Sequence, residues 1–145
     1  MCDYSLEAHA SRAAEVGDKL VTSGFSNSRT RGFCAVGCPD VAVCLLPGTE
    51  LAFDRSATFD GLWGLILRAC KRGSRTARFR QIDMDIPGTH HDAVEFDSGR
   101  IVMLTQLRTG QRATVLQLPV KPRIANHVPR KNAQSSNTPM LQPAG

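Results

Sequence analysis

Side chains alternate between apolar and polar through residues 93–120, and this alternation constrains the fold more than any other feature. Residues 93–97 alternate strictly, and residues 101–104 form a short apolar run. In the third segment one face would carry Thr114, Leu116, Leu118 and Val120. Turn-forming residues at 97–99 and 109–111 separate the three segments. A side-chain period of two is that of a strand, so this stretch predicts three consecutive, mainly antiparallel strands.

The same pattern recurs upstream. Residues 19–25, 31–36, 41–46 and 50–54 form four short segments, and residues 75–83 a fifth, in which Arg78 and Arg80 share a side opposite Phe79. The first four are spaced about 8–12 residues apart, which is typical of small sandwiches and barrels. Residues 37–40 are predicted to break the chain between two of them. We therefore predict one mainly β domain over residues 1–120, a small antiparallel barrel or sandwich.

Two segments have a helical period instead. Apolar residues at offsets 0, 3, 4, 7, 8 and 11 predict one packed helix near residues 59–72, with a buried loop as the alternative; they are Phe59, Leu62, Trp63, Ile66, Leu67 and Cys70. Thr58 or Asp60 could cap its start. A second, short helix is predicted over residues 5–15, where alanines share one side before Gly17.

The charge of the chain is uneven. The net charge is +5, every acidic residue lies at or before Asp97, and the last 25 residues hold four basic residues. Residues 1–120 alone therefore have a net charge of +1. From Lys121 onward Pro, Asn, Ser and Gln dominate and periodicity ends, so residues 121–145 are predicted to be a flexible basic tail.

The composition indicates the cellular compartment of the protein. The longest apolar runs are far shorter than a membrane span, and the first residues include acids and lack a charged-then-apolar leader. Five cysteines, at positions 2, 34, 38, 44 and 70, are then expected to be reduced thiols. We expect a cytoplasmic protein with no membrane partner.

The loop over residues 83–92 holds the densest set of metal-ligand side chains. Asp83, Asp85, His90 and Asp92 could hold a divalent metal ion, because imidazole nitrogen and carboxylate oxygen both suit zinc, manganese or iron. If residues 90–92 begin a strand, His90 and Asp92 share one side and His91 faces the other. No standard metal spacing is present, and the alternative interpretation is a polar loop with exposed histidines.

A basic cluster covers residues 68–80. Six cations lie within 13 residues without an acid among them, namely Arg68, Lys71, Arg72, Arg75, Arg78 and Arg80. Such a patch suits phosphates, although no aromatic side chain shares its side for base stacking. The alternative is a solvated face that complements the end of a helix.

The thiols give two further hypotheses. Cys34 and Cys38, with Cys44 nearby, could form half of a zinc site, but the second half is missing, which favours core packing. Removal of Met1 would expose Cys2 as a nucleophile or chelator, and the sequence does not tell whether Met1 is removed. No complete catalytic constellation is present.

Several segments carry a family resemblance. They are MCDYSL at 1–6, VGDKLV at 16–21, VAVCLLPGTE at 41–50, ARFRQ at 77–81, HHDA at 90–93 and GQRATVLQLP at 110–119. Together they resemble a family of small uncharacterised bacterial proteins over residues 1 to about 120. The resemblance implies no activity and no assigned site. Similar proteins often carry His where this chain has Glu7, which argues against a metal site here unless His9 substitutes.

These features lead to three functional hypotheses. The first is a non-catalytic binding or regulatory module for an anionic partner, either nucleic acid or an acidic protein surface. The second is a small metalloprotein or metal-dependent enzyme that uses the loop 83–92. The third is a structural or oligomerising subunit. Ligand, strand order and oligomeric state do not follow from the sequence.

Overall fold

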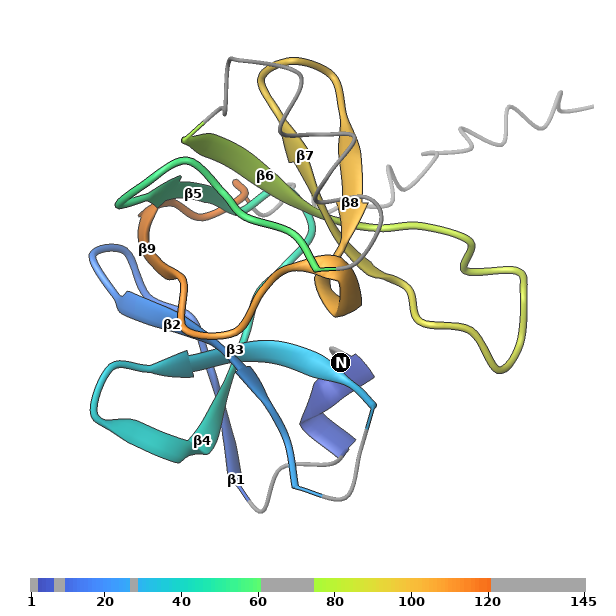
Figure 1. The fold of residues 1–145 in the computed structure, drawn as a ribbon, viewed down its shortest axis with the longest axis horizontal. Coiled ribbons are helices and arrows are strands. Elements are labelled where there is room, and N and C mark those ends of the chain that lie inside the picture. Colours follow the sequence, from blue (N-terminus) through green and yellow to red (C-terminus); the bar gives the residue numbers. More distant parts are fainter. Residues whose placement is uncertain (1–2, 7–9, 27–28, 61–74, 121–145) are drawn as a thin grey trace, which may run out of the picture.

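The computed structural model describes residues 3–6, 10–26, 29–60 and 75–120, and within them the chain is mainly β (Figure 1). In chain order the elements are η1 Asp3–Leu6, β1 Ala10–Ala13, β2 Lys19–Gly24, β3 Arg31–Ala35, β4 Cys38–Cys44, β5 Glu50–Phe53, β6 Thr76–Gln81, β7 Asp92–Phe96, β8 Ile101–Met103, η2 Leu104–Gln106 and β9 Arg112–Gln117. The labels η1 and η2 denote short 3-10 helices. None of the described helices is long and apolar enough to cross a membrane.

The nine strands form one sheet in the order β1-β4-β3-β2-β9-β5-β6-β7-β8. Neighbouring strands are antiparallel except β1, which runs parallel to β4. The prediction of a mainly antiparallel β domain is confirmed. Its barrel alternative is wrong, because β1 and β8 end the sheet as edge strands and do not pair with each other among the described residues.

One hydrophobic core serves the whole sheet. Buried side chains come both from β2, β3 and β4, and from β5, β6 and β7, and they join in a single cluster. The largest fully buried ones include Tyr4, Phe33 and Phe79. In Figure 1 strands β1 to β4 and strands β5 to β8 occupy opposite parts of the molecule, and β9 lies between β2 and β5 in the sheet. Burial of this apolar surface is the main source of stability.

The alternation predicted for the strands explains their two faces. In β6, Ala77 and Phe79 are buried while Arg78 and Arg80 are exposed, as a period of two requires. Residues 41–44 of the predicted strand 41–46 belong to β4, whose two neighbours are β1 and β3, and Leu45 and Leu46 follow its end. The predicted strands at 19–25, 31–36, 50–54, 75–83, 93–97 and 101–104 all correspond to observed ones, with ends that differ by at most two residues.

Strand β4 begins earlier than predicted. The break expected over residues 37–40 is confined to the turn at Gly37, whose φ is 87°, and β4 already starts at Cys38. The register between β3 and β4 shifts here, since Ala35 lies opposite Cys38 but Cys34 lies opposite Ala42. Pro39 fits within this irregular stretch because a bulge leaves backbone groups outside the regular ladder.

The first predicted helix is wrong. Of residues 5–15 the structure describes 5–6 and 10–15, and these contain the end of η1 and the strand β1. Ala10 lies opposite Val41 and Ala13 opposite Cys44, so β1 extends the sheet alongside β4. Hydrogen bonding to a distant strand outweighs the weak local helix preference of alanine.

Strand β9 differs from the prediction in which side chains face the core and in which strands lie beside it. Ala113 and Val115 are buried, whereas Leu116 is 46% exposed and Val120 85% exposed, so the face predicted to carry Leu116 and Val120 is largely the outer one. The strand pairs with β2 and β5 and leaves β8 as an edge. A shift of one residue reverses every side chain in a strand, and the neighbours on both sides set the register.

Most of the second predicted helix lies outside the described residues, as does the predicted tail over 121–145. At the described start of that helix, Phe59 forms an isolated bridge with Leu107 and is not helical. Its ring packs edge-on against Phe96 at a centroid distance of 5.9 Å. Asp60, predicted as a cap, instead pairs with Arg31 and Arg108.

Candidate functional site

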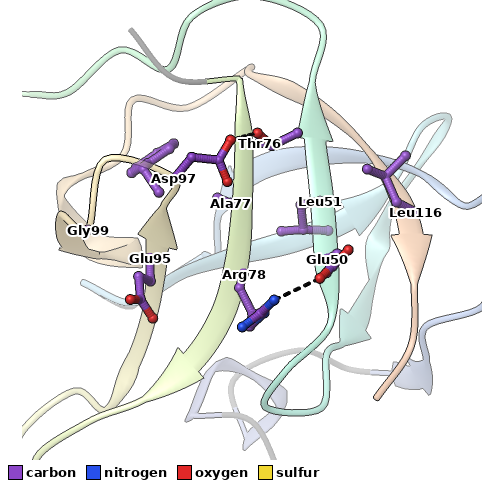
Figure 2. Close-up of a pocket in the computed structure, with 10 residues that line it drawn as sticks. Glu50, Leu51, Thr76, Ala77, Arg78, Glu95, Asp97, Gly99 and Leu116 are labelled. Atoms are coloured by element: carbon purple, nitrogen blue, oxygen red, sulfur yellow. Dashed lines mark hydrogen bonds and ion pairs between the residues drawn. The ribbon is translucent and has the colours of Figure 1, made fainter. Parts of the chain in front are cut away.

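The outer face of β5, β6 and β7 carries a ladder of opposite charges (Figure 2). The registers place Arg78 of β6 between Glu50 of β5 and Glu95 of β7. Its guanidinium Nη2 donates to Glu50 Oε1 at 2.8 Å, and this hydrogen bond raises the pKa of Arg78. Arg80, two residues along β6, forms an ion pair with Glu95. Cross-strand pairs of this kind hold an exposed sheet face in one arrangement.

A pocket of about 340 Å³ lies along this ladder. It is lined by Glu50, Leu51, Thr76, Ala77, Arg78, Glu95, Phe96, Asp97, Gly99 and Leu116. The lining has three carboxylates and one guanidinium, a net charge of −2, and Arg80 beside it offsets one of these charges through its ion pair with Glu95. Leu116 adds an exposed apolar side chain from β9 at one side, as Figure 2 shows. The charged groups could fix the orientation of a bound partner, and Leu116 offers it an apolar contact.

The predicted basic cluster is only partly described. Arg68, Lys71 and Arg72 lie outside the described residues, and Arg75 is exposed immediately before β6. Arg78 and Arg80 share the outer face, as predicted, but each faces a carboxylate from a neighbouring strand. An anion would have to compete with Glu50 and Glu95 for these guanidinium groups. The anion site therefore stays a prediction.

The predicted metal loop is spread over two environments. Asp83, Asp85 and His90 are exposed in the loop before β7, while Asp92 is buried at the start of that strand. No group of three or more potential ligand side chains lies together anywhere in the part of the chain that the structure describes. His91 is half-buried, and its Nδ1 lies 3.0 Å from the carbonyl oxygen of Ile82.

Asp92 instead forms a reciprocal contact with Asp3. Its Oδ2 accepts a hydrogen bond from the Asp3 backbone at 3.0 Å, and its Oδ1 accepts one from the Gln81 amide at 3.1 Å. Asp3 Oδ2 in turn accepts from the backbone of Asp92 at 3.2 Å and from that of His91. The contact ties η1 to β7, and sequence reasoning did not find it because its partners lie 89 positions apart.

The environment of Asp92 changes its acidity. The carboxyl is 3% exposed, and burial raises its pKa above the usual value of 3.8. The charge of Asp3 raises the pKa further, while the hydrogen bond from Gln81 opposes the increase. A buried carboxylate held by hydrogen bonds is a structural group here, and it is not open to a ligand.

We expect the replacement Asp92→Asn to remove part of the pH dependence of stability. The folded chain binds the Asp92 proton more tightly than the unfolded chain, so wild-type stability falls as pH rises from 3.8 through the raised pKa. The asparagine amide of the variant does not titrate, so the variant lacks this fall. Urea unfolding across the acidic range measures the difference, with the exposed Asp85→Asn as a matched control. Parallel pH profiles for wild type and Asp92→Asn would contradict the prediction.

The cysteines do not form the suggested zinc half-site. Cys34 is buried with a free thiol that contacts the Pro39 carbonyl oxygen at 3.2 Å, and burial raises its pKa. Cys38 is free and exposed. The expectation of reduced thiols is wrong for Cys44, which is disulfide-bonded. Cys2 lies outside the described residues.

Comparisons with protein-family models, with curated proteins and with solved structures find no match for this chain. The resemblance of its segments to a family of small bacterial proteins therefore stays an expectation.

Proposed function

We propose that this chain is a non-catalytic binding module that holds a macromolecular partner on the outer face of β5, β6 and β7. The observation that carries the proposal is the pocket along the ladder of Glu50, Arg78 and Glu95. The face is preorganised, because β6 pairs on both sides with antiparallel strands and its arginines are held by ion pairs. Such a surface can bind a partner without large rearrangement.

The charge of the pocket favours a basic partner over the anionic partner predicted from the sequence. Its lining has an excess of two negative charges, one of which Arg80 offsets through its ion pair with Glu95, and Glu50 accepts a hydrogen bond from Arg78. A lysine or arginine side chain from a partner would meet Glu50, Glu95 and Asp97, with an apolar neighbour against Leu116. Complementary charge of this kind gives specificity and speeds association.

The test uses three fluorescent probes: a peptide of alternating lysine and leucine, a glutamate-rich peptide and a single-stranded RNA. Fluorescence anisotropy should show binding of the basic peptide to the full chain, weakened by salt. The double variant Glu50→Gln, Glu95→Gln should weaken it by roughly fivefold to tenfold. The control Asp83→Asn, Asp85→Asn removes the same charge from an exposed loop outside the pocket and should have no such effect.

Two outcomes would contradict the proposal. If RNA or the acidic peptide bound more tightly than the basic peptide, the result would support an anionic partner instead. Absence of binding by all three probes, together with self-association in sedimentation, would favour the structural-subunit hypothesis.

A further inference from the structure

None of the described elements packs on the outer face of β5, β6 and β7. The charged and apolar groups of this face determine which kind of segment could bind there. The pocket there carries three carboxylates, one guanidinium and the exposed side of Leu116. A complementary segment would be rich in cations, free of acids and provided with apolar residues.

Residues 121–145 of the same chain have this composition. They include Lys121, Arg123, Arg130 and Lys131 together with Ile124, Val128, Met140 and Leu141, and they contain no acid. Their cations therefore have no carboxylate partner within the segment. The nearest source of opposite charge is the folded domain itself.

The segment also starts beside the pocket. Gln117, the last residue of β9, lies opposite Glu50, and Leu116 lines the pocket. Pro119 Cβ lies 3.2 Å from the place that a Cβ on Gly48 would take, so the chain still runs along the start of β5 after the strand ends. At about 3.3–3.6 Å per residue, Lys121 and the cations after it can reach the carboxylates. A tether this short gives local concentrations of roughly millimolar.

We propose that residues 121–145 occupy the pocket of their own chain and place lysine and arginine side chains against Glu50, Glu95 and Asp97. This inference depends on the proposed function, because it makes the segment an intramolecular competitor of a basic partner. Each exposed ion pair is weak and is screened by salt, so the segment is displaceable. Neutralising its charges should then tighten the binding of a basic peptide.

Carbodiimide cross-linking of the full chain tests the proposal. The reagent joins a lysine to a carboxylate only when the two touch, and the chain has four lysines, at positions 19, 71, 121 and 131. Lys131 is the informative one, because it lies far enough from β9 to reach many acids. In the monomer fraction we expect its links to Glu50, Glu95 and Asp97 to outnumber those to Asp40, Asp83 and Asp85 by roughly fivefold. High salt should remove this preference.

A matched pair of variants controls for net charge. Arg123→Gln with Arg130→Gln keeps the reporter Lys131 and should reduce its links to the pocket, while Arg29→Gln with Arg55→Gln removes two exposed cations elsewhere and should not. An even spread of Lys131 links over all six acids, or links insensitive to salt, would overturn the inference. If the basic peptide still binds when the Lys131 links show no preference, the inference about residues 121–145 is wrong but the proposed function stands. If cross-links from Lys131 to the pocket form in the wild type, but the Arg123→Gln, Arg130→Gln variant still binds no basic peptide, the proposed function fails.

Discussion

Replacement of Tyr4 by alanine is expected to lower the free energy of unfolding by about 3–5 kcal/mol, the range for removing a large buried aromatic side chain. Tyr4 is fully buried in the core. Its ring stacks on Phe25 with a centroid distance of 5.7 Å and an angle of 11° between the planes. Its hydroxyl donates to the backbone carbonyl of Val43, which fixes η1 to β4. Urea denaturation of wild type and variant measures the loss.

A double-mutant cycle with Gly32 provides the control. A Cβ at Gly32 would lie 2.2 Å from Cγ of Tyr4, so Gly32→Ala should itself destabilise by about 1–3 kcal/mol through overpacking. In the Tyr4→Ala background the clash is gone, and most of that effect should vanish. Gly24→Ala, where no atom lies within 4 Å of the new Cβ, separates the clash from the general effect of the substitution. Additive effects of Tyr4→Ala and Gly32→Ala would show that the two sites do not contact.

The second large effect is expected at alkaline pH. Burial, and then the charge of Asp92, raises the pKa of Tyr4 well above its usual value of 10.0. Above pH 10 the unfolded chain releases the phenol proton while the folded chain keeps it. The sign is therefore a loss of stability with rising pH, at about 1.4 kcal/mol per pH unit. Tyr4 is the only tyrosine, so tyrosinate absorbance reports this one group, and we expect it to rise together with unfolding.

Tyr4→Phe isolates this contribution. Cys34 also has a raised pKa and adds its own alkaline loss of stability, so the comparison is between wild type and variant. The variant should lose about 1 kcal/mol at neutral pH, because the Val43 carbonyl has no donor, and should have a shallower alkaline slope. Tyrosinate that forms near pH 10 while the far-ultraviolet circular dichroism stays native would contradict the prediction.

The strands could be predicted because their pattern is local. Alternation around Arg78 and Arg80 gave both the existence of β6 and its exposed side. The partners of those arginines could not be predicted, since Glu50 and Glu95 come from strands whose order depends on the whole sheet. Carboxylates on the neighbouring strands therefore balance the positive charge of these two arginines.

The predictions for residues 5–15 and for β9 were wrong because distant segments pair with each other. Ala10 to Ala13 have a weak helical pattern, but β4 supplies backbone partners about 31 positions away. The phase of β9 depends on β2 and β5 together. Asp3 and Asp92 find each other across most of the chain, and nothing near either residue signals the contact.

The place of β9 has a consequence for biosynthesis. Among the described strands, the last to leave the ribosome is the middle one of the sheet, with β2 on one side and β5 on the other. Until residues 112–117 emerge, β2 and β5 each lack the neighbouring strand that joins the two halves of the sheet. Native assembly must then wait for β9, and folding should be slow because so many contacts join remote positions. Ribosome-bound chains that stop before β9 should accordingly depend on chaperones.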